Sequence, residues 1–163
     1  MKGENLEVLR EVKLLGTVIS SDLKWDKNTD KLVKDANKRM KMLHVAAKFV
    51  SNNQDMVYLY KTFVRSALEY SAVVWHSSLS QKNIDDLERI QKSALKVILK
   101  EKYKDYKSAL SDLNLQSLSD RRENLCLRFA KKSLKLLNFK KLFPHSKKFH
   151  VMNQRKRRKF FCE

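Results

Sequence analysis

Glycine and proline are almost absent from this sequence, whose 163 residues include only Gly3, Gly16 and Pro144. β-Sandwiches and barrels need many turns, and glycine and proline supply much of the backbone geometry that turns require. A chain with so few turn-forming residues favours long helices joined by short polar connections. Its length is enough for one domain with a real core, because a domain of this size buries roughly 70% of its unfolded surface.

Apolar residues recur at steps of three and four along most of the chain, the spacing of one helix face. One such stripe consists of Leu32, Ala36, Met40, Leu43, Ala47 and Val50. The pattern predicts a mainly α fold of about five helices, at residues 27–50, from 51 to about 75, 81–100, 103–113 and 117–137. The expected N-caps of the first three helices are Asp26, Ser51 and Ser80.

Residues 5–20 depart from this helical pattern and predict a short β-hairpin. We expect a first arm at Leu6 and Val8, a turn near Arg10 and a second arm over residues 12–19. An isolated two-stranded hairpin is only marginally stable in water. It is therefore expected to pack on the helices, or on a sheet that this chain does not contain.

The chain carries a formal charge of +18, from 36 basic and 18 acidic residues. A surplus of this size indicates a polyanionic partner, either nucleic acid or an anionic membrane surface. The alternative is that lysine-rich helices are simply well solvated. No apolar stretch is long enough to span a bilayer, so we expect nucleic acid as the partner and no membrane.

The segment 138–163 concentrates this charge, with nine basic residues and one acidic residue. A like-charged run with little apolar content is expected to be flexible and disordered when unbound. Its densest part, QRKRRK, suits a nuclear import signal, and a merely solvated end is the competing interpretation. Two distant cysteines, Cys126 and Cys162, form no disulfide framework, which indicates an intracellular protein that can also be nuclear.

Catalytic chemistry finds little support in the sequence. The adjacent Asp85 and Asp86 lie where the first turn of a helix is expected, and acidic residues there favour the helix dipole without any metal. His145, His150 and Cys162 supply only three zinc ligands and no Cys-x-x-Cys pair. A glycine-rich phosphate loop is also absent. We therefore expect no metal and no cofactor.

Binding to phosphates by exposed basic side chains is the remaining chemistry. The candidate nucleic-acid-binding residues are Lys13, Lys34, Lys38, Lys41, Lys131, Lys132, Arg155, Lys156, Arg157, Arg158 and Lys159. Tyr103 and Tyr106 are interleaved with lysines in the segment KEKYKDYK. Aromatic rings in such a setting either stack on bases or line the edge of the core, and the sequence leaves both interpretations open.

The order of several segments resembles the primer-grip and thumb region of non-LTR retrotransposon reverse transcriptases of the jockey-like type. The segments that carry the resemblance are VKLLGTVISSDLKWDKNTDKL (12–32), YKTFVRSALEYSAVVWHSSL (60–79), LERIQKSALKVIL (87–99) and ALSDLNLQSLSDRRENLCLRFAKK (109–132). The resemblance covers about residues 5–144. It divides the chain into a primer-grip-like hairpin (1–21), a helical thumb-like domain (22–137) and the basic tail (138–163).

The resemblance implies that the hairpin packs beside a catalytic palm, whose paired aspartates follow a Tyr/Phe-Ala motif. This chain contains no such tetrad, so we expect no polymerase activity and no enzyme. Lys13, Leu15 and Gly16 map to the grip. Leu14 stands where the family usually has tyrosine, and Ser66 stands where relatives often have proline, a change expected to straighten the second helix.

Two functions from different classes follow. In the first, the chain is a fragment of an RNA-directed DNA polymerase that lacks the palm and binds RNA–DNA hybrid, DNA or RNA non-specifically. In the second, it is an inert remnant or a protein-interaction module. Its exposed hairpin edge would then recruit another chain, either the missing palm or a second copy.

Overall fold

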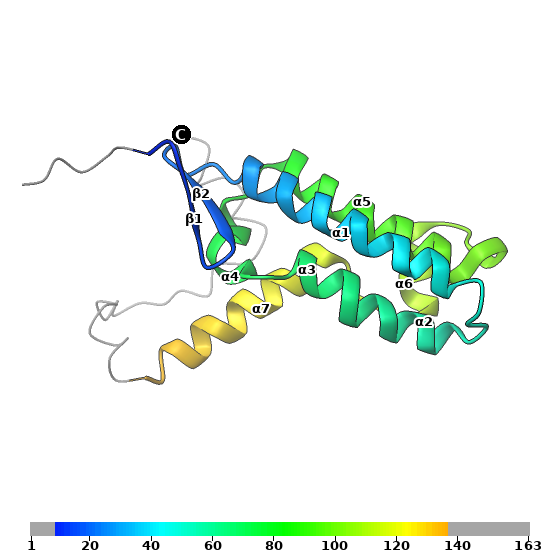
Figure 1. Ribbon diagram of the computed structural model, residues 1–163. Helices are drawn as coiled ribbons and strands as arrows, with labels where there is room; N and C mark the ends of the chain where they lie inside the picture. The colour runs from blue at the N-terminus through cyan, green and yellow to red at the C-terminus, as the bar shows by residue number, and fades with distance from the viewer. Residues whose placement is uncertain (1–8, 137–163) are drawn as a thin grey trace, which may run out of the picture. The chain divides into compact units, whose positions relative to one another are not determined.

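The computed structural model describes residues 9–136, which are mainly helical and begin with an antiparallel hairpin (Figure 1). The predicted fold class is therefore confirmed. The arm expected at Leu6 and Val8 and the tail at 138–163 lie outside the described residues. The chain divides into two compact units between Phe129 and Ala130. The elements up to Phe129 belong to the first unit.

The hairpin consists of β1 (Glu11–Leu14) and β2 (Thr17–Ser20), which pair antiparallel in a two-stranded sheet. The predicted single strand over residues 12–19 is wrong, because the chain reverses in the middle of that segment. Leu15 and Gly16 form the turn, with φ of 46° and 83°. Positive φ at both central positions suits the twist of a two-residue hairpin, and glycine adopts it without steric cost.

Two long helices, α1 (Asp26–Ala46) and α5 (Gln81–Leu99), pack side by side and run in the same direction. Asn83 Nδ2 donates to Asp26 Oδ1 at 2.9 Å near their beginnings, and Lys100 Nζ donates to the Ala47 carbonyl at 2.9 Å near their ends. Four members of the stripe predicted for α1, from Leu32 to Leu43, are buried. The last two, Ala47 and Val50, are only half-buried and follow the end of the helix at Ala46. The pair therefore presents one side to the core and the other to solvent.

Two of the three predicted N-caps are wrong. Asp26 is the first residue of α1 and makes no side-chain cap, since its carboxylate binds Asn83 instead. Asn52, not Ser51, caps α2 (Asn53–Leu59), and its Oδ1 accepts from the Gln54 N–H at 3.0 Å. Ser80 caps α5 as predicted. Neighbouring serine, asparagine and aspartate residues are near-equal caps, so sequence alone does not separate them.

The second predicted helix is interrupted twice. After α2 comes a π-helical segment, η1 (Tyr60–Arg65), followed by α3 (Ser66–Leu68). Helical φ and ψ continue through Ser66, whose Oγ donates back to the Thr62 carbonyl at 2.5 Å. The expectation that serine straightens this helix stays a prediction. Ser71 then adopts φ of 53°, and the chain continues as α4 (Ala72–Trp75) and η2 (His76–Ser78).

These interruptions change which residues are buried. Tyr60, Val64 and Leu68 are fully buried. Phe63 and Tyr70 are apolar as well but have 43% and 50% of their surfaces exposed. A π-turn inserts an extra residue into the helical repeat, so positions counted at regular helical spacing rotate away from the core.

The remaining elements of the first unit close the core around Gln91. They are η3 (Lys100–Lys102), α6 (Tyr106–Asp112) and α7 (Leu118–Ser133), which crosses the division between the units. Gln91 accepts from Tyr60 Oη at 2.5 Å and donates to the Tyr106 Oη at 2.8 Å. It also donates to the Gln116 carbonyl at 3.0 Å. Burial of this polar side chain in α5 is tolerated because both its amide oxygen and its amide nitrogen form hydrogen bonds.

Candidate nucleic-acid interface

Three of the predicted lysines lie together on the exposed side of α1. Lys34, Lys38 and Lys41 follow steps of four and three, which places them opposite the buried stripe. Lys38 lies 3.9 Å from Asp35, a distance typical of a weak surface ion pair. Lys34 and Lys41 form no ion pair with any residue from 9 to 136. Their charges are therefore available to an external anion.

A second basic row, which the sequence analysis missed, lies on the exposed side of α5. Arg89, Lys92 and Lys96 follow steps of three and four, opposite the buried side of the helix. Lys100 follows directly after the last residue of α5 and donates to the Ala47 carbonyl. Only Arg89 is ion-paired within the described chain, with Asp86 at 3.1 Å. The same helical period that separates a buried from an exposed side of this helix would have identified the row.

The parallel packing of α1 and α5 brings both rows to neighbouring helices. Because the two helices begin together and end together, both rows run in the same direction. Fixed rows of cations on adjacent helices raise the local positive potential above that of a single row. Such a surface suits the regularly spaced phosphates of a nucleic-acid backbone.

Tyr106 is a structural residue and not a free stacking surface. Its Oη donates to Glu88 and accepts from Gln91. Burial, followed by the hydrogen bond to Glu88, raises the pKa of Tyr106 well above its ordinary value of 10.0. Tyr103 also packs against the core. Lys92 and Lys96 lie over these rings, at 5.2 Å from Tyr106 and 5.5 Å from Tyr103, so the rings help to position two members of the α5 row.

The residues that map to the family's grip form the hairpin turn. The Leu15 carbonyl accepts from Tyr70 Oη at 2.7 Å, and the Gly16 carbonyl accepts from the Lys31 ammonium. A Cβ at Gly16 would lie 3.4 Å from the Tyr70 ring, which is contact distance, and the φ of 83° would strain any other residue there. Lys13 is exposed on β1, opposite Val18. The turn is thus anchored to the helices through its backbone carbonyls, and within residues 9–136 none of the three α1 lysines forms a hydrogen bond with it.

The other predicted cations lie in the second unit or outside the described residues. Lys131 and Lys132 lie in the last turn of α7, in the second unit. The tail cluster Arg155–Lys159 lies outside the described residues.

A further group of charges is buried and was not identified from the sequence. Glu69 accepts from Arg121 Nε at 2.5 Å and lies 3.7 Å from Arg65 Nε. Arg122 is fully buried, its Nε lies 3.4 Å from His76 Nδ1, and its guanidinium lies 5.8 Å from the Trp75 ring. Burial lowers the pKa of Arg122 and, together with the Arg122 charge, lowers the pKa of His76 to about 4.

Two kinds of site are not found in the described part of the chain. Within residues 9–136, no three His, Cys, Asp or Glu side chains come close enough together to hold a metal ion. None of the helices in that range has the length and apolarity needed to cross a bilayer.

Comparison with known proteins returns no relative. No family model, no curated protein and no solved structure matches this chain. The resemblance to reverse-transcriptase thumb segments therefore stays a prediction, and the function rests on the geometry of the surface described above.

Proposed function

We propose that this chain binds the phosphate backbone of nucleic acid without sequence specificity, through the basic rows of α1 and α5. The observation that carries the proposal is the alignment of these rows on two parallel helices, with Lys34, Lys41, Lys92 and Lys96 forming no ion pair among residues 9–136. Lysine contacts to phosphate release condensed counterions, which gives affinity that depends strongly on salt and little on sequence. Duplex DNA, RNA–DNA hybrid and RNA all present this chemistry.

The test replaces Lys34, Lys38 and Lys41 together by glutamine and measures binding to a labelled duplex over a series of salt concentrations. Each lost phosphate contact reduces the slope of log K against log salt by about 1, so the triple variant should reduce it by about 2 to 3. The matched control replaces three exposed lysines outside both rows by glutamine, Lys102, Lys104 and Lys107. This control removes the same charge from another part of the surface.

Two results would refute the proposal. The first is binding that does not change with salt. The second is an equal loss of slope in both triple variants, because net charge alone would then explain the affinity.

The origin of the chain as a thumb fragment of a retrotransposon polymerase is a separate proposal, supported by the segments quoted above. On this proposal, bond formation belongs to a palm that carries the paired aspartates, and this chain contributes only binding. Sequencing the genome in frame upstream of the first codon tests it. A palm with paired aspartates is the expected result, and unrelated coding sequence would contradict it.

A second function, recruitment of another chain by the hairpin, is favoured by one observation. All four residues of β1 are exposed, and Leu15 at the turn has 83% of its surface exposed. An open strand edge with apolar side chains promotes pairing with another strand. Light scattering tests this alternative, since a monodisperse monomer at high concentration would contradict pairing between copies.

A further inference from the structure

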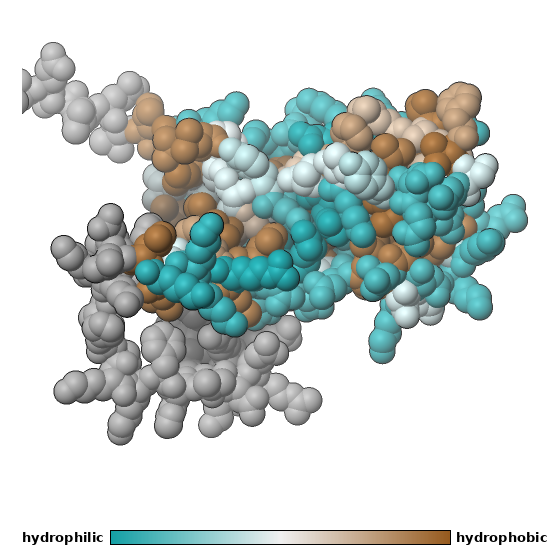
Figure 2. All heavy atoms as spheres, turned by 90° about the horizontal axis from the view of Figure 1, so that it is seen from below, coloured by the Kyte–Doolittle hydropathy of each residue, from teal (hydrophilic) through white to brown (hydrophobic). Residues whose placement is uncertain are grey.

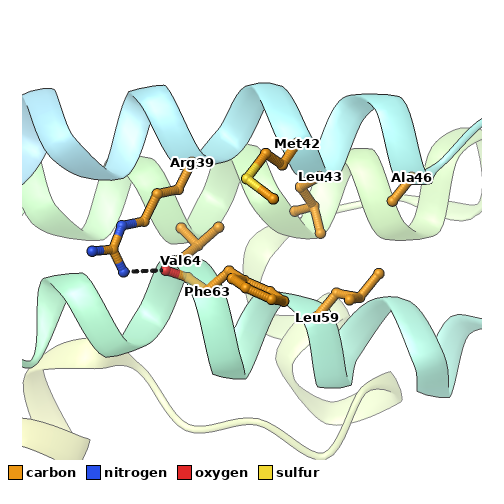
Figure 3. Close-up of a pocket in the computed structure, with 7 residues that line it drawn as sticks. All are labelled: Arg39, Met42, Leu43, Ala46, Leu59, Phe63 and Val64. Atoms are coloured by element: carbon orange, nitrogen blue, oxygen red, sulfur yellow. Dashed lines mark hydrogen bonds between the residues drawn. The ribbon is translucent and has the colours of Figure 1, made fainter.

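An apolar groove runs between α1 and the antiparallel segment formed by α2 and η1 (Figure 3). A hollow of about 80 Å³ in this groove is lined by Arg39, Met42, Leu43, Ala46, Leu59, Phe63 and Val64. A neighbouring hollow shares Met42 and Ala46 and adds Lys41 and Val45. The two hollows therefore form one continuous surface along the C-terminal half of α1.

Large apolar side chains that line this groove remain open to solvent. Met42 has 58% of its surface exposed, Val45 has 56% and Phe63 has 43%. Phe49 and Tyr58, which are close to lining residues in the chain, are exposed as well. In Figure 2, hydrophobic side chains are visible at both ends of the molecule, and those at the right-hand end lie where Figure 1 shows the connection between α1 and α2. Contiguous apolar patches of this kind mark binding sites more often than isolated exposed residues do.

The charges at the groove are almost all positive. Arg39 and Lys41 are the charged residues that line the two hollows. Arg39 uses one nitrogen, Nη1, to bind the Phe63 carbonyl at 2.8 Å, so its other donors can reach a ligand (Figure 3). Of the nearby carboxylates, Asp35 lies one turn before Arg39 and pairs with Lys38, and Asp55 lies one turn before Leu59.

We propose that this groove binds an amphipathic helix of a partner protein, with acidic residues flanking the helix's apolar face. A channel between two helices accepts the apolar side chains of a third helix at positions i, i+4 and i+7. Carboxylates beside that apolar row would meet Arg39 and Lys41, which gives the complementarity that selects a partner. This function goes beyond nucleic-acid binding and does not depend on it.

Two other occupants fit the groove less well. A second copy would bring Arg39 and Lys41 of two molecules close together, and each molecule carries a formal charge of +18. A nucleobase needs hydrogen-bonding groups around its edge, but the hollow offers only the Arg39 guanidinium among otherwise apolar lining residues. A small apolar hollow is better filled by a leucine or isoleucine side chain.

The experiment measures fluorescence anisotropy of a labelled synthetic helix of about 18 residues with leucines at i, i+4, i+7 and i+11. One peptide carries glutamates beside the leucines, and its partner peptide carries glutamines there. The full-length chain should bind the glutamate peptide about tenfold more tightly. Met42→Ser should weaken that binding by about tenfold, because it removes the side chain shared by both hollows.

The matched control is Leu14→Ser on the hairpin, since Leu14 is 57% exposed and Met42 is 58% exposed. This control should bind the peptide like the parent chain, and circular dichroism should show both variants folded. Equal binding by folded Met42→Ser would overturn the proposal, because the acidic peptide would then be held by net charge alone.

Two further outcomes would overturn the proposal of a partner helix, because they would show that a second copy of the chain or a nucleobase occupies the groove. One is a dimer, seen by sedimentation velocity, that Met42→Ser abolishes. The other is a labelled single-stranded oligonucleotide that loses affinity in Met42→Ser while the glutamate peptide does not.

Discussion

The outer face of α1 and α5 and the junction of α3, α4 and α7 both contain basic residues, but the two regions use them in opposite ways. On the outer face, Lys34 and Lys41 are exposed and unpaired within the described chain. At the junction, Arg65 and Arg121 share Glu69, and Arg122 is fully buried. The formal charge therefore overstates the number of basic side chains that can contact a polyanion, because some of them are buried or ion-paired within the fold.

The largest expected effect is at the junction. Glu69→Ala should lower the free energy of unfolding by about 2 kcal/mol, because it leaves two poorly exposed guanidinium groups without their shared carboxylate. Urea denaturation measures the change. Asp35→Ala on the outer face is the control and should cost under about 0.5 kcal/mol. Similar losses for the two variants would show that the regions do not differ as described.

Arg122 should show the opposite sign. Neither of its terminal nitrogens has a hydrogen-bond partner among the described residues, although the side chain is fully buried. Replacement by methionine keeps most of the volume and removes a desolvated charge, so Arg122→Met should raise the free energy of unfolding by about 1 kcal/mol. Arg121→Met, which breaks the contact with Glu69, should lower it. A clear loss of stability in Arg122→Met would mean that the guanidinium is well paired in solution.

The difference between the two regions also shows what the sequence could reveal. Helical spacing predicted the buried stripe of α1 and the exposed positions of Lys34, Lys38 and Lys41, because both follow from one helix period. The junction could not be predicted in this way. Glu69, Arg121 and His76 are brought together by contacts between distant segments, and no local pattern encodes such contacts.

The hairpin turn and the π-helical segment were missed for local reasons. Leu15 is an unusual residue at a position with positive φ, so the turn lacked the asparagine or aspartate that normally identifies it. The extra residue in η1 is invisible to a search at fixed spacing. As a result, the sequence did not show that Phe63 lines a groove and is not part of the core.

The pH dependence of stability should also come from the junction. Burial and the Arg122 charge hold the pKa of His76 at about 4, below its ordinary 6.5, so the folded state resists protonation. Below pH 6.5 the unfolded chain binds a proton at this residue that the folded chain does not. Stability should therefore fall as the pH decreases from 6.5 to 4. His76→Gln should remove this part of the loss, and identical pH profiles for both proteins would contradict it.

The smallest expected effect, and the one that separates the two regions most cleanly, is on the outer face. The variant with Lys34, Lys38 and Lys41 replaced by glutamine should change the free energy of unfolding by less than about 0.5 kcal/mol, because exposed charges contribute little to folding. In the salt titration, the slope of log K against log salt should fall by about 2 to 3 for the same variant, which corresponds to the loss of two to three phosphate contacts. Residues whose role is to bind an external anion should affect affinity without affecting the stability of the fold. If stability fell as much as in Glu69→Ala, the α1 row would instead be part of the structure, and its role in binding would lose its support.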